Sequence, residues 1–223
     1  MPSDACPASS VMRPPLEHDP MVPTALDARS LEVGTPSGPA HVSLTKRGKA
    51  GLFVIGHGAG GGIDAVDIVA VSSALASVGW TVARVVQPYR VRGRRAPEAP
   101  ARLDAAWTAV IDALGKERAR RLVVSGRSSG ARVAVRTARA VGADAVVALA
   151  FPLHPPGRPE KSRAEELSGL TVPHLVVQGE RDAFGRPAEL PAGTNVVGVP
   201  GDHSLKQAPD VVAATVSAWL DSR

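Results

Sequence analysis

Two kinds of hydrophobic pattern alternate along this chain, short runs of mostly apolar residues and longer amphipathic segments. Runs of the first kind are typical of strands buried on both faces of a parallel sheet; they lie at 50–56, which is continuous, and at 81–86, 121–125, 145–151, 174–178 and 195–199. Helical periodicity predicts helices over 65–78, 101–118, 129–141 and 208–220, with Asp64 capping the first. This alternation predicts an α/β fold, a doubly wound, mostly parallel sheet with helices on both faces.

The segments before residue 50 follow other patterns. Alternating apolar positions over 29–33 and 40–45 flank a Gly/Pro-rich turn, which predicts a β-hairpin at the sheet edge. Residues 1–25 contain six prolines, a composition typical of a flexible leader. We therefore expect a leader over 1–25 and a single domain over 26–223, a length that one α/β core accommodates.

Charge, cysteine content and the length of the apolar runs limit which binding partners and which cellular compartment the sequence favours. The net charge is +5, but the basic residues are spread over several segments, which disfavours nucleic-acid binding. The single cysteine, Cys6, allows no internal disulfide, in agreement with a reducing compartment, and excludes thiolate zinc sites. Neither a membrane span nor a signal peptide is evident. We expect a cytoplasmic protein with a small-molecule substrate, without metal or cofactor, and of undetermined oligomeric state.

The apolar run 121–125 ends in Gly126-Arg127-Ser128-Ser129-Gly130, and a helix-forming segment follows at once. A serine at the tip of such a strand–turn–helix unit has a strained backbone and presents its hydroxyl at the strand's carboxyl end. The flanking glycines remove Cβ atoms that would collide. We predict that Ser128 is a nucleophile; the alternative is a tight turn in which this serine caps the helix.

A serine hydroxyl needs a base, and that base needs a third group to orient it. Two later strand ends supply them, because Asp182 and His203 each lie in the loop after an apolar run. The order Ser128, Asp182, His203 is the order of α/β-hydrolases. Glu180 is the alternative acid, whereas Asp202 is disfavoured because neighbouring side chains on an extended backbone point apart.

The segment His57-Gly-Ala-Gly-Gly61 directly follows the run 50–56. Its backbone can aim N–H groups at a developing oxyanion, so we predict an oxyanion hole from the amides of Ala59 and Ser129, with Gly60 as a substitute for Ala59. A phosphate or dinucleotide loop is the rival interpretation. It fails in detail, since neither a Gly-Lys-Ser/Thr sequence nor an acidic residue after the next strand is present.

Further polar side chains at the strand ends are candidate substrate contacts: His57, Tyr89, Arg127 and His154. Tyr89, His154 and the arginines of the loop after residue 87 would suit an anionic acyl group, and the alternative is a solvated arginine loop. The prolines around His154 indicate a rigid turn as its first role. The segment 152–173 is too short for a large helical lid, which predicts an open site for small or flexible esters, thioesters or lactones.

From about residue 50 onward the chain resembles the α/β-hydrolase superfamily. Within it, the chain is similar to the small dienelactone-hydrolase-like branch found in the regulatory NSL complex subunit and testis-expressed protein families. The matching segments are His57-Gly-Ala-Gly-Gly, Gly126-Arg-Ser-Ser-Gly-Ala-Arg-Val-Ala, Phe151-Pro-Leu-His-Pro-Pro-Gly, Gln178-Gly-Glu-Arg-Asp-Ala-Phe-Gly and Asp202-His-Ser-Leu-Lys. The resemblance implies a Ser–Asp–His hydrolase without naming its substrate. A non-catalytic interaction domain on this fold is the alternative, and hydrolysis is not distinguished from acyl transfer.

Overall fold

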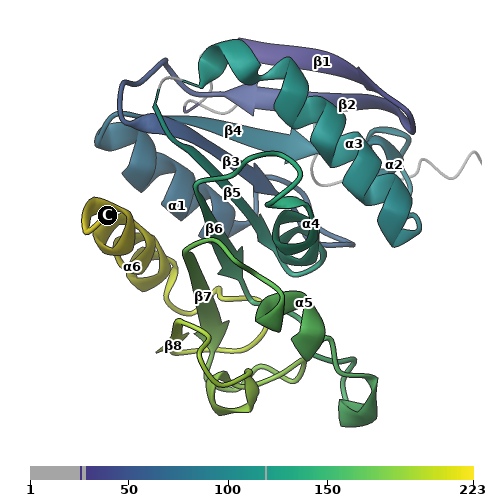
Figure 1. Ribbon diagram of the computed structural model, residues 1–223, viewed down its shortest axis with the longest axis vertical. Helices are drawn as coiled ribbons and strands as arrows, with labels where there is room; N and C mark the ends of the chain where they lie inside the picture. Colours follow the sequence, from purple (N-terminus) through teal and green to yellow (C-terminus); the bar gives the residue numbers. More distant parts are fainter. Residues whose placement is uncertain (1–25, 27–28, 119) are drawn as a thin grey trace, which may run out of the picture.

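The computed structural model describes residues 26, 29–118 and 120–223, so the leader predicted over 1–25 lies outside the described residues. Its strands form one eight-stranded sheet in the order β1-β2-β4-β3-β5-β6-β7-β8 (Figure 1). The strands are β1 (Arg29–Thr35), β2 (Gly38–Leu44), β3 (Gly51–Gly56), β4 (Trp80–Val86), β5 (Leu122–Arg127), β6 (Ala145–Leu149), β7 (His174–Gly179) and β8 (Val196–Val199). β1, β2 and β4 pair antiparallel, and all other neighbours pair parallel, which confirms the predicted hairpin and the mostly parallel sheet.

Helices cover both faces of this sheet, as predicted. Figure 1 shows α1 (Val66–Ser77) and α6 (Pro209–Asp221) on one side, and α3 (Pro100–Ala113) and α4 (Ser129–Thr137) on the other. Alternate residues of β3 enter the two resulting cores, with Phe53 and Ile55 facing α1 and α6 and Leu52 and Val54 facing α3 and α4. Because both faces are buried, every position of such a strand is apolar, and the run in the sequence is unbroken.

Several element boundaries differ from those expected. The loop after residue 87 contains a short helix, α2 (Pro88–Val91), whose proline occupies the first turn, where no N–H is needed. Asp64 does not cap α1; the cap position is Ala65, without a side-chain hydrogen bond, and Asp64 instead lies 3.7 Å from the Arg84 guanidinium. α3 ends at Ala113, ahead of the 3₁₀ turn η1 (Gly115–Glu117). Hydrophobic periodicity does not distinguish these terminal turns from continued helix.

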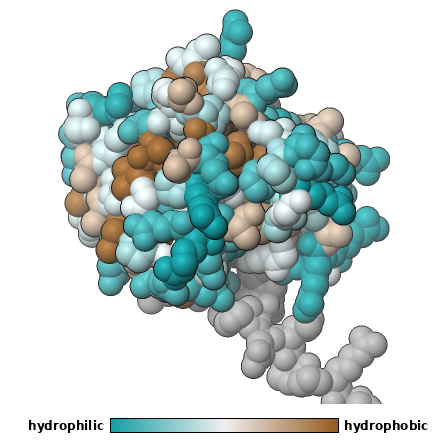
Figure 2. Space-filling model, turned by 90° about the horizontal axis from the view of Figure 1, so that it is seen from below, coloured by the Kyte–Doolittle hydropathy of each residue, from teal (hydrophilic) through white to brown (hydrophobic). Residues whose placement is uncertain are grey.

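The chain between β6 and β7 forms only the 3₁₀ turn η2 (Pro159–Lys161) and the short helix α5 (Ala164–Ser168). A further 3₁₀ turn, η3 (Pro187–Glu189), precedes β8. Seen from the end of the molecule drawn lowest in Figure 1, apolar residues form separate groups among hydrophilic ones (Figure 2). Because η2 and α5 are the only elements between β6 and β7, the expectation of a minimal lid is confirmed.

Candidate active site

Ser128 is the turn residue between β5 and α4, and its backbone lies at φ 53° and ψ −114°. A left-handed φ is unusual for a residue with a side chain and signals a constrained turn. The glycines two before and two after it are required sterically. A Cβ on Gly126 would lie 2.2 Å from the carbonyl carbon of Gly130, and one on Gly130 would lie 2.7 Å from the carbonyl oxygen of Gly56. This close packing of α4 on the sheet places Ser128 at the carboxyl end of β5.

The structure brings together the three predicted residues Ser128, Asp182 and His203. The Ser128 Oγ lies 2.8 Å from the Nε2 of His203, and the Nδ1 of His203 lies 2.8 Å from the Asp182 Oδ2. Ser128 occupies the N-cap position of α4, as in the alternative interpretation, but its hydroxyl forms no capping hydrogen bond to that helix. Glu180 is exposed, and Asp202 accepts hydrogen bonds from Ser204 within its own turn.

Two residues that the sequence analysis missed support Asp182 and His203. The buried Gln178 donates through Nε2 to the Asp182 Oδ2 at 2.8 Å, and the Phe184 N–H donates to Oδ1 at 2.8 Å. The Phe184 ring also stacks on the His203 imidazole with centroids 4.1 Å apart. Donors on both oxygens fix the orientation of the carboxylate. A glutamine at the end of the otherwise apolar run 174–178 was the available signal for Gln178.

His57 is 2% exposed, and both ring nitrogens have partners in the protein. Nδ1 lies 2.8 Å from the Gly58 carbonyl oxygen, and Nε2 accepts a hydrogen bond from the Gln87 N–H at 3.1 Å. Burial lowers the pKa of His57 to about 4, so the ring is neutral near pH 7 and donates through Nδ1. His57 therefore anchors the glycine-rich loop to the end of β4, and its contact with a substrate stays a prediction.

Tyr89 supports the same loop from α2. Its hydroxyl donates to the Ala59 carbonyl oxygen at 2.8 Å, and its ring packs edge-on against His57 at a centroid distance of 5.8 Å. Burial raises the pKa of Tyr89 to about 12, which keeps the hydroxyl protonated as a donor. Tyr89 thus contributes to the shape of the loop, and its predicted contact with a substrate is untested.

The glycine-rich loop lies beside Ser128. A Cβ on Gly58 would be 3.5 Å from the Ser128 Cβ, and the Gly61 N–H donates to the Gly58 carbonyl at 3.2 Å, which closes a turn with Ala59 and Gly60 at its tip. The Ser129 N–H belongs to the first turn of α4, where amides have no helical acceptor. The candidate donors therefore flank Ser128. Which amide faces an oxyanion stays a prediction.

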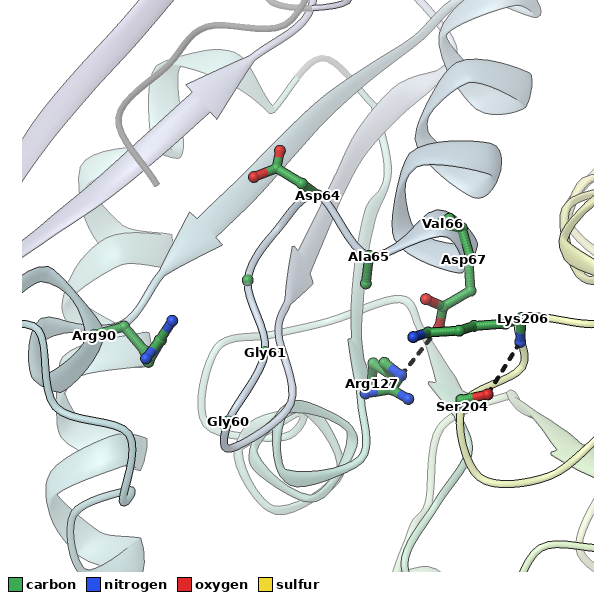
Figure 3. Close-up of a pocket in the computed structure, with 11 residues that line it drawn as sticks. Gly60, Gly61, Asp64, Ala65, Val66, Asp67, Arg90, Arg127, Ser204 and Lys206 are labelled. Carbon is green, nitrogen blue, oxygen red and sulfur yellow. Dashed lines mark hydrogen bonds and ion pairs between the residues drawn. The ribbon is translucent and has the colours of Figure 1, made fainter. Parts of the chain in front are cut away.

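A pocket of about 480 Å³ lies between the glycine-rich loop, the start of α1 and the turn after His203. Figure 3 shows Gly60 and Gly61 with Arg90 on one side and Arg127 and Lys206 on the other. Among the predicted substrate contacts, Arg127 lines this pocket, as does Arg90 from the arginine loop after residue 87, whereas His57, Tyr89 and His154 do not. His154 is 9% exposed. Its backbone N–H donates to the Phe184 carbonyl at 3.0 Å, so His154 stabilises the turn beside Asp182.

The fold and this cluster of serine, histidine and aspartate define an α/β hydrolase. Residues 49–212 match the family described as alpha/beta hydrolase domain, and the chain belongs to this family. No curated protein matches the chain by sequence. Among the described residues, no helix is both long and apolar enough to cross a membrane.

Solved structures of low sequence identity share the fold. XC6422 from Xanthomonas campestris, described as an a/b serine hydrolase without lid, is 21% identical with a TM-score of 0.66, over 89% of this chain and 97% of that one. Est1E from Butyrivibrio proteoclasticus is 17% identical with a TM-score of 0.67, over 86% and 98%. The Pyrococcus furiosus esterase Pf2001 is 16% identical with a TM-score of 0.70, over 87% and 89%.

Proposed function

We propose that this hydrolase is a serine esterase that cleaves small esters, thioesters or lactones through an acyl-serine intermediate. The observation that supports this is the pair of 2.8 Å contacts that join Ser128 Oγ to His203 and His203 to Asp182. In these roles Ser128 is the nucleophile, His203 the general base and acid, and Asp182 the group that orients the imidazole and stabilises its positive charge.

The chemistry proceeds in two halves. His203 Nε2 takes the Ser128 proton while Oγ attacks the substrate carbonyl carbon, and the amides of Ala59 and Ser129 stabilise the oxyanion. Collapse of the tetrahedral intermediate breaks the bond to the leaving oxygen or sulfur, which receives the proton from His203. Water then donates a proton to His203 and attacks the acyl carbon, and Ser128 leaves with that proton. Asp182 keeps the imidazole oriented throughout.

Substrate size follows from the short chain segment between β6 and β7. With only η2 and α5 there, no helical lid covers the site. The neighbouring pocket of about 480 Å³ is lined by Arg127 but not by Ser128, Asp182 or His203, and it has room for a small acyl group. The description of XC6422 as lacking a lid and of Pf2001 as an esterase favours the same class of substrate. Membership of the dienelactone-hydrolase-like branch, a cytoplasmic location and the absence of nucleic-acid or membrane partners are further parts of this proposal.

Labelling with a fluorophosphonate probe tests the proposal. We expect labelling of the wild type and none of Ser128→Ala, and His203→Ala should label at least about a hundredfold more slowly. Ser125→Ala is the matched control, because Ser125 lies buried on the same strand and its hydroxyl has no hydrogen-bond partner among the residues that the structure describes. Persistent labelling of Ser128→Ala, or no labelling of a folded wild-type protein, would contradict the proposal and favour a non-catalytic interaction domain.

A further inference from the structure

The Arg127 guanidinium links three segments around the nucleophile. Its Nη2 donates to the backbone carbonyl of His203 at 3.0 Å, and its Nε lies 3.3 Å from the Oδ2 of Asp67 in the first turn of α1. A Cβ on Gly58 would come within 3.1 Å of Nη1, so the guanidinium also packs against the glycine-rich loop. Arg127 immediately precedes Ser128, and therefore one side chain connects the nucleophile strand to the His203 backbone and to α1.

This link matters because His203 lies on irregular backbone. The segment between β8 and α6 forms only turns, in which Leu205 has a φ of 53° and its N–H bonds to the Asp202 carbonyl. Phe184 and Asp182 contact the His203 ring, whereas Arg127 holds its backbone. An imidazole must satisfy Ser128 and Asp182 at once, and displacements near 1 Å cost about a hundredfold in rate.

Asp67 explains how Arg127 is held. Its side chain is 1% exposed and forms an ion pair with Arg127, whose side chain is 16% exposed, and the backbone N–H groups at the start of α1, those of Ile68 and of Asp67 itself, also stabilise the carboxylate. Burial raises the pKa of Asp67, and the Arg127 charge opposes that shift. A buried carboxylate of this kind needs its cation, and Figure 3 shows the Asp67 carboxylate paired with the Arg127 guanidinium. Asp67 therefore fixes the guanidinium where Nη2 reaches the His203 carbonyl.

We propose that Arg127, oriented by Asp67, is a positioning residue that holds the backbone of His203 beside the nucleophile. This inference rests on the proposed function of Ser128, Asp182 and His203. It differs from the sequence-based expectation that Arg127 contacts the substrate, since two of its nitrogens are engaged with His203 and Asp67. The two roles separate kinetically, because a positioning residue affects kcat and a substrate contact affects KM.

Steady-state kinetics of Arg127→Met with p-nitrophenyl acetate and the anionic p-nitrophenyl hemisuccinate distinguish these roles. We expect kcat to fall by about ten- to a hundredfold for both esters, with KM changed less than about twofold. Arg127→Lys, which keeps a cation beside Asp67, should recover part of kcat. A higher KM for the hemisuccinate alone, at unchanged kcat, would overturn the proposal and assign Arg127 to substrate binding.

Arg136→Met is the matched control for lost stability. Arg136 is 19% exposed and forms an ion pair with Asp104 at 2.6 Å, but it lies on the far part of α4 and touches none of the proposed catalytic residues. We expect it to lower thermal stability and to leave kcat within about twofold of the wild type. An equal loss of kcat in Arg136→Met and Arg127→Met would show a general effect of instability and overturn the assignment.

A second readout does not depend on turnover. The proton between His203 Nδ1 and Asp182 gives a downfield ¹H NMR resonance, assigned by its loss in His203→Ala, and Arg127→Met should broaden it through faster exchange with water. The double variant Asp67→Asn/Arg127→Met removes both charges of the pair, so that no uncompensated buried carboxylate destabilises the folded protein. We expect its kcat to match that of Arg127→Met, and an unchanged resonance with wild-type kcat in the folded double variant would refute the proposal.

Ser128-dependent labelling of the wild type tests the proposed function separately.

Discussion

At the scale of single residues, His57 makes the clearest prediction about pH. Burial lowers its pKa from 6.5 to about 4, so between these values the unfolded chain binds a proton that the folded protein excludes. The free energy of unfolding should therefore be unaffected by His57 above pH 6.5 and should fall as the pH drops toward 4, by up to about 3 kcal/mol. Urea unfolding at about pH 8 and about pH 5 measures this difference.

The comparison with His57→Gln isolates the effect, since a glutamine does not titrate and the other titrating groups are shared. We expect the variant to lose less stability than the wild type between the two pH values. Identical pH dependence in both proteins would show that His57 binds a proton at about pH 5 as readily in the folded protein as in the unfolded chain.

The residues that the fold brings together were predictable from the sequence where the signal is local, and their catalytic roles stay predictions. The turn glycines around Ser128 and the positions of Asp182 and His203 after strands lie within a few residues of each other or of a strand end. Gln178 is also near its partner, four residues before Asp182, whereas the ion pair of Arg127 joins distant segments, because Asp67 lies on α1. Nothing near Arg127 in the sequence indicates that Asp67 is its partner, so only the folded chain shows this pair.

At the scale of elements, the contact between α4 and β3 depends on a missing side chain. A Cβ on Gly130 would lie 2.7 Å from the carbonyl oxygens of both Gly56 and His57, and backbone atoms cannot move aside as a side chain can. Gly130→Ala should lower the free energy of unfolding by about 2 kcal/mol and reduce esterase activity, because α4 begins next to Ser128. Chemical denaturation measures the first effect.

Gly115→Ala is the control for that substitution. A Cβ at Gly115 meets no atom within 4 Å, and its φ lies outside the left-handed region. The change in stability should stay within about 0.5 kcal/mol. Equal destabilisation by both alanines would contradict the steric explanation, because helix propensity and the entropy of the unfolded chain both favour alanine over glycine.

The elements themselves followed from periodicity, and their ends did not. Buried strands such as β3 and β5 appear as apolar runs because both faces are covered. The presence of α2 and the ends of α3 depend on the geometry of local turns. The pattern of hydrophobic and polar residues does not reveal that geometry. The first turn of α1 also lacks its expected cap, since the Asp64 carboxylate lies near the buried Arg84, a residue 20 positions away in the sequence.

At the scale of the whole molecule, the order of the strands gathers the site at one edge. β5, β7 and β8 run parallel, so Ser128, Asp182 and His203 follow their carboxyl ends and meet there. The sheet order was not predictable from the sequence, but the parallel arrangement alone brings these ends to one side. The same edge is left open by the short segment between β6 and β7.

This openness predicts how the rate depends on acyl length. Complete burial of each added methylene contributes about 0.8 kcal/mol, which is about a fourfold gain in kcat/KM. The apolar side chains that line the pocket are those of Ala65 and Val66, and Val66 is 46% exposed. Only a short acyl chain therefore gains apolar contact. We expect kcat/KM for p-nitrophenyl esters to level off after the shortest acyl groups and then to stay flat or decline. A steady fourfold rise per methylene up to octanoate would instead require an enclosed acyl tunnel, and would contradict the open site on which the proposed substrate class depends.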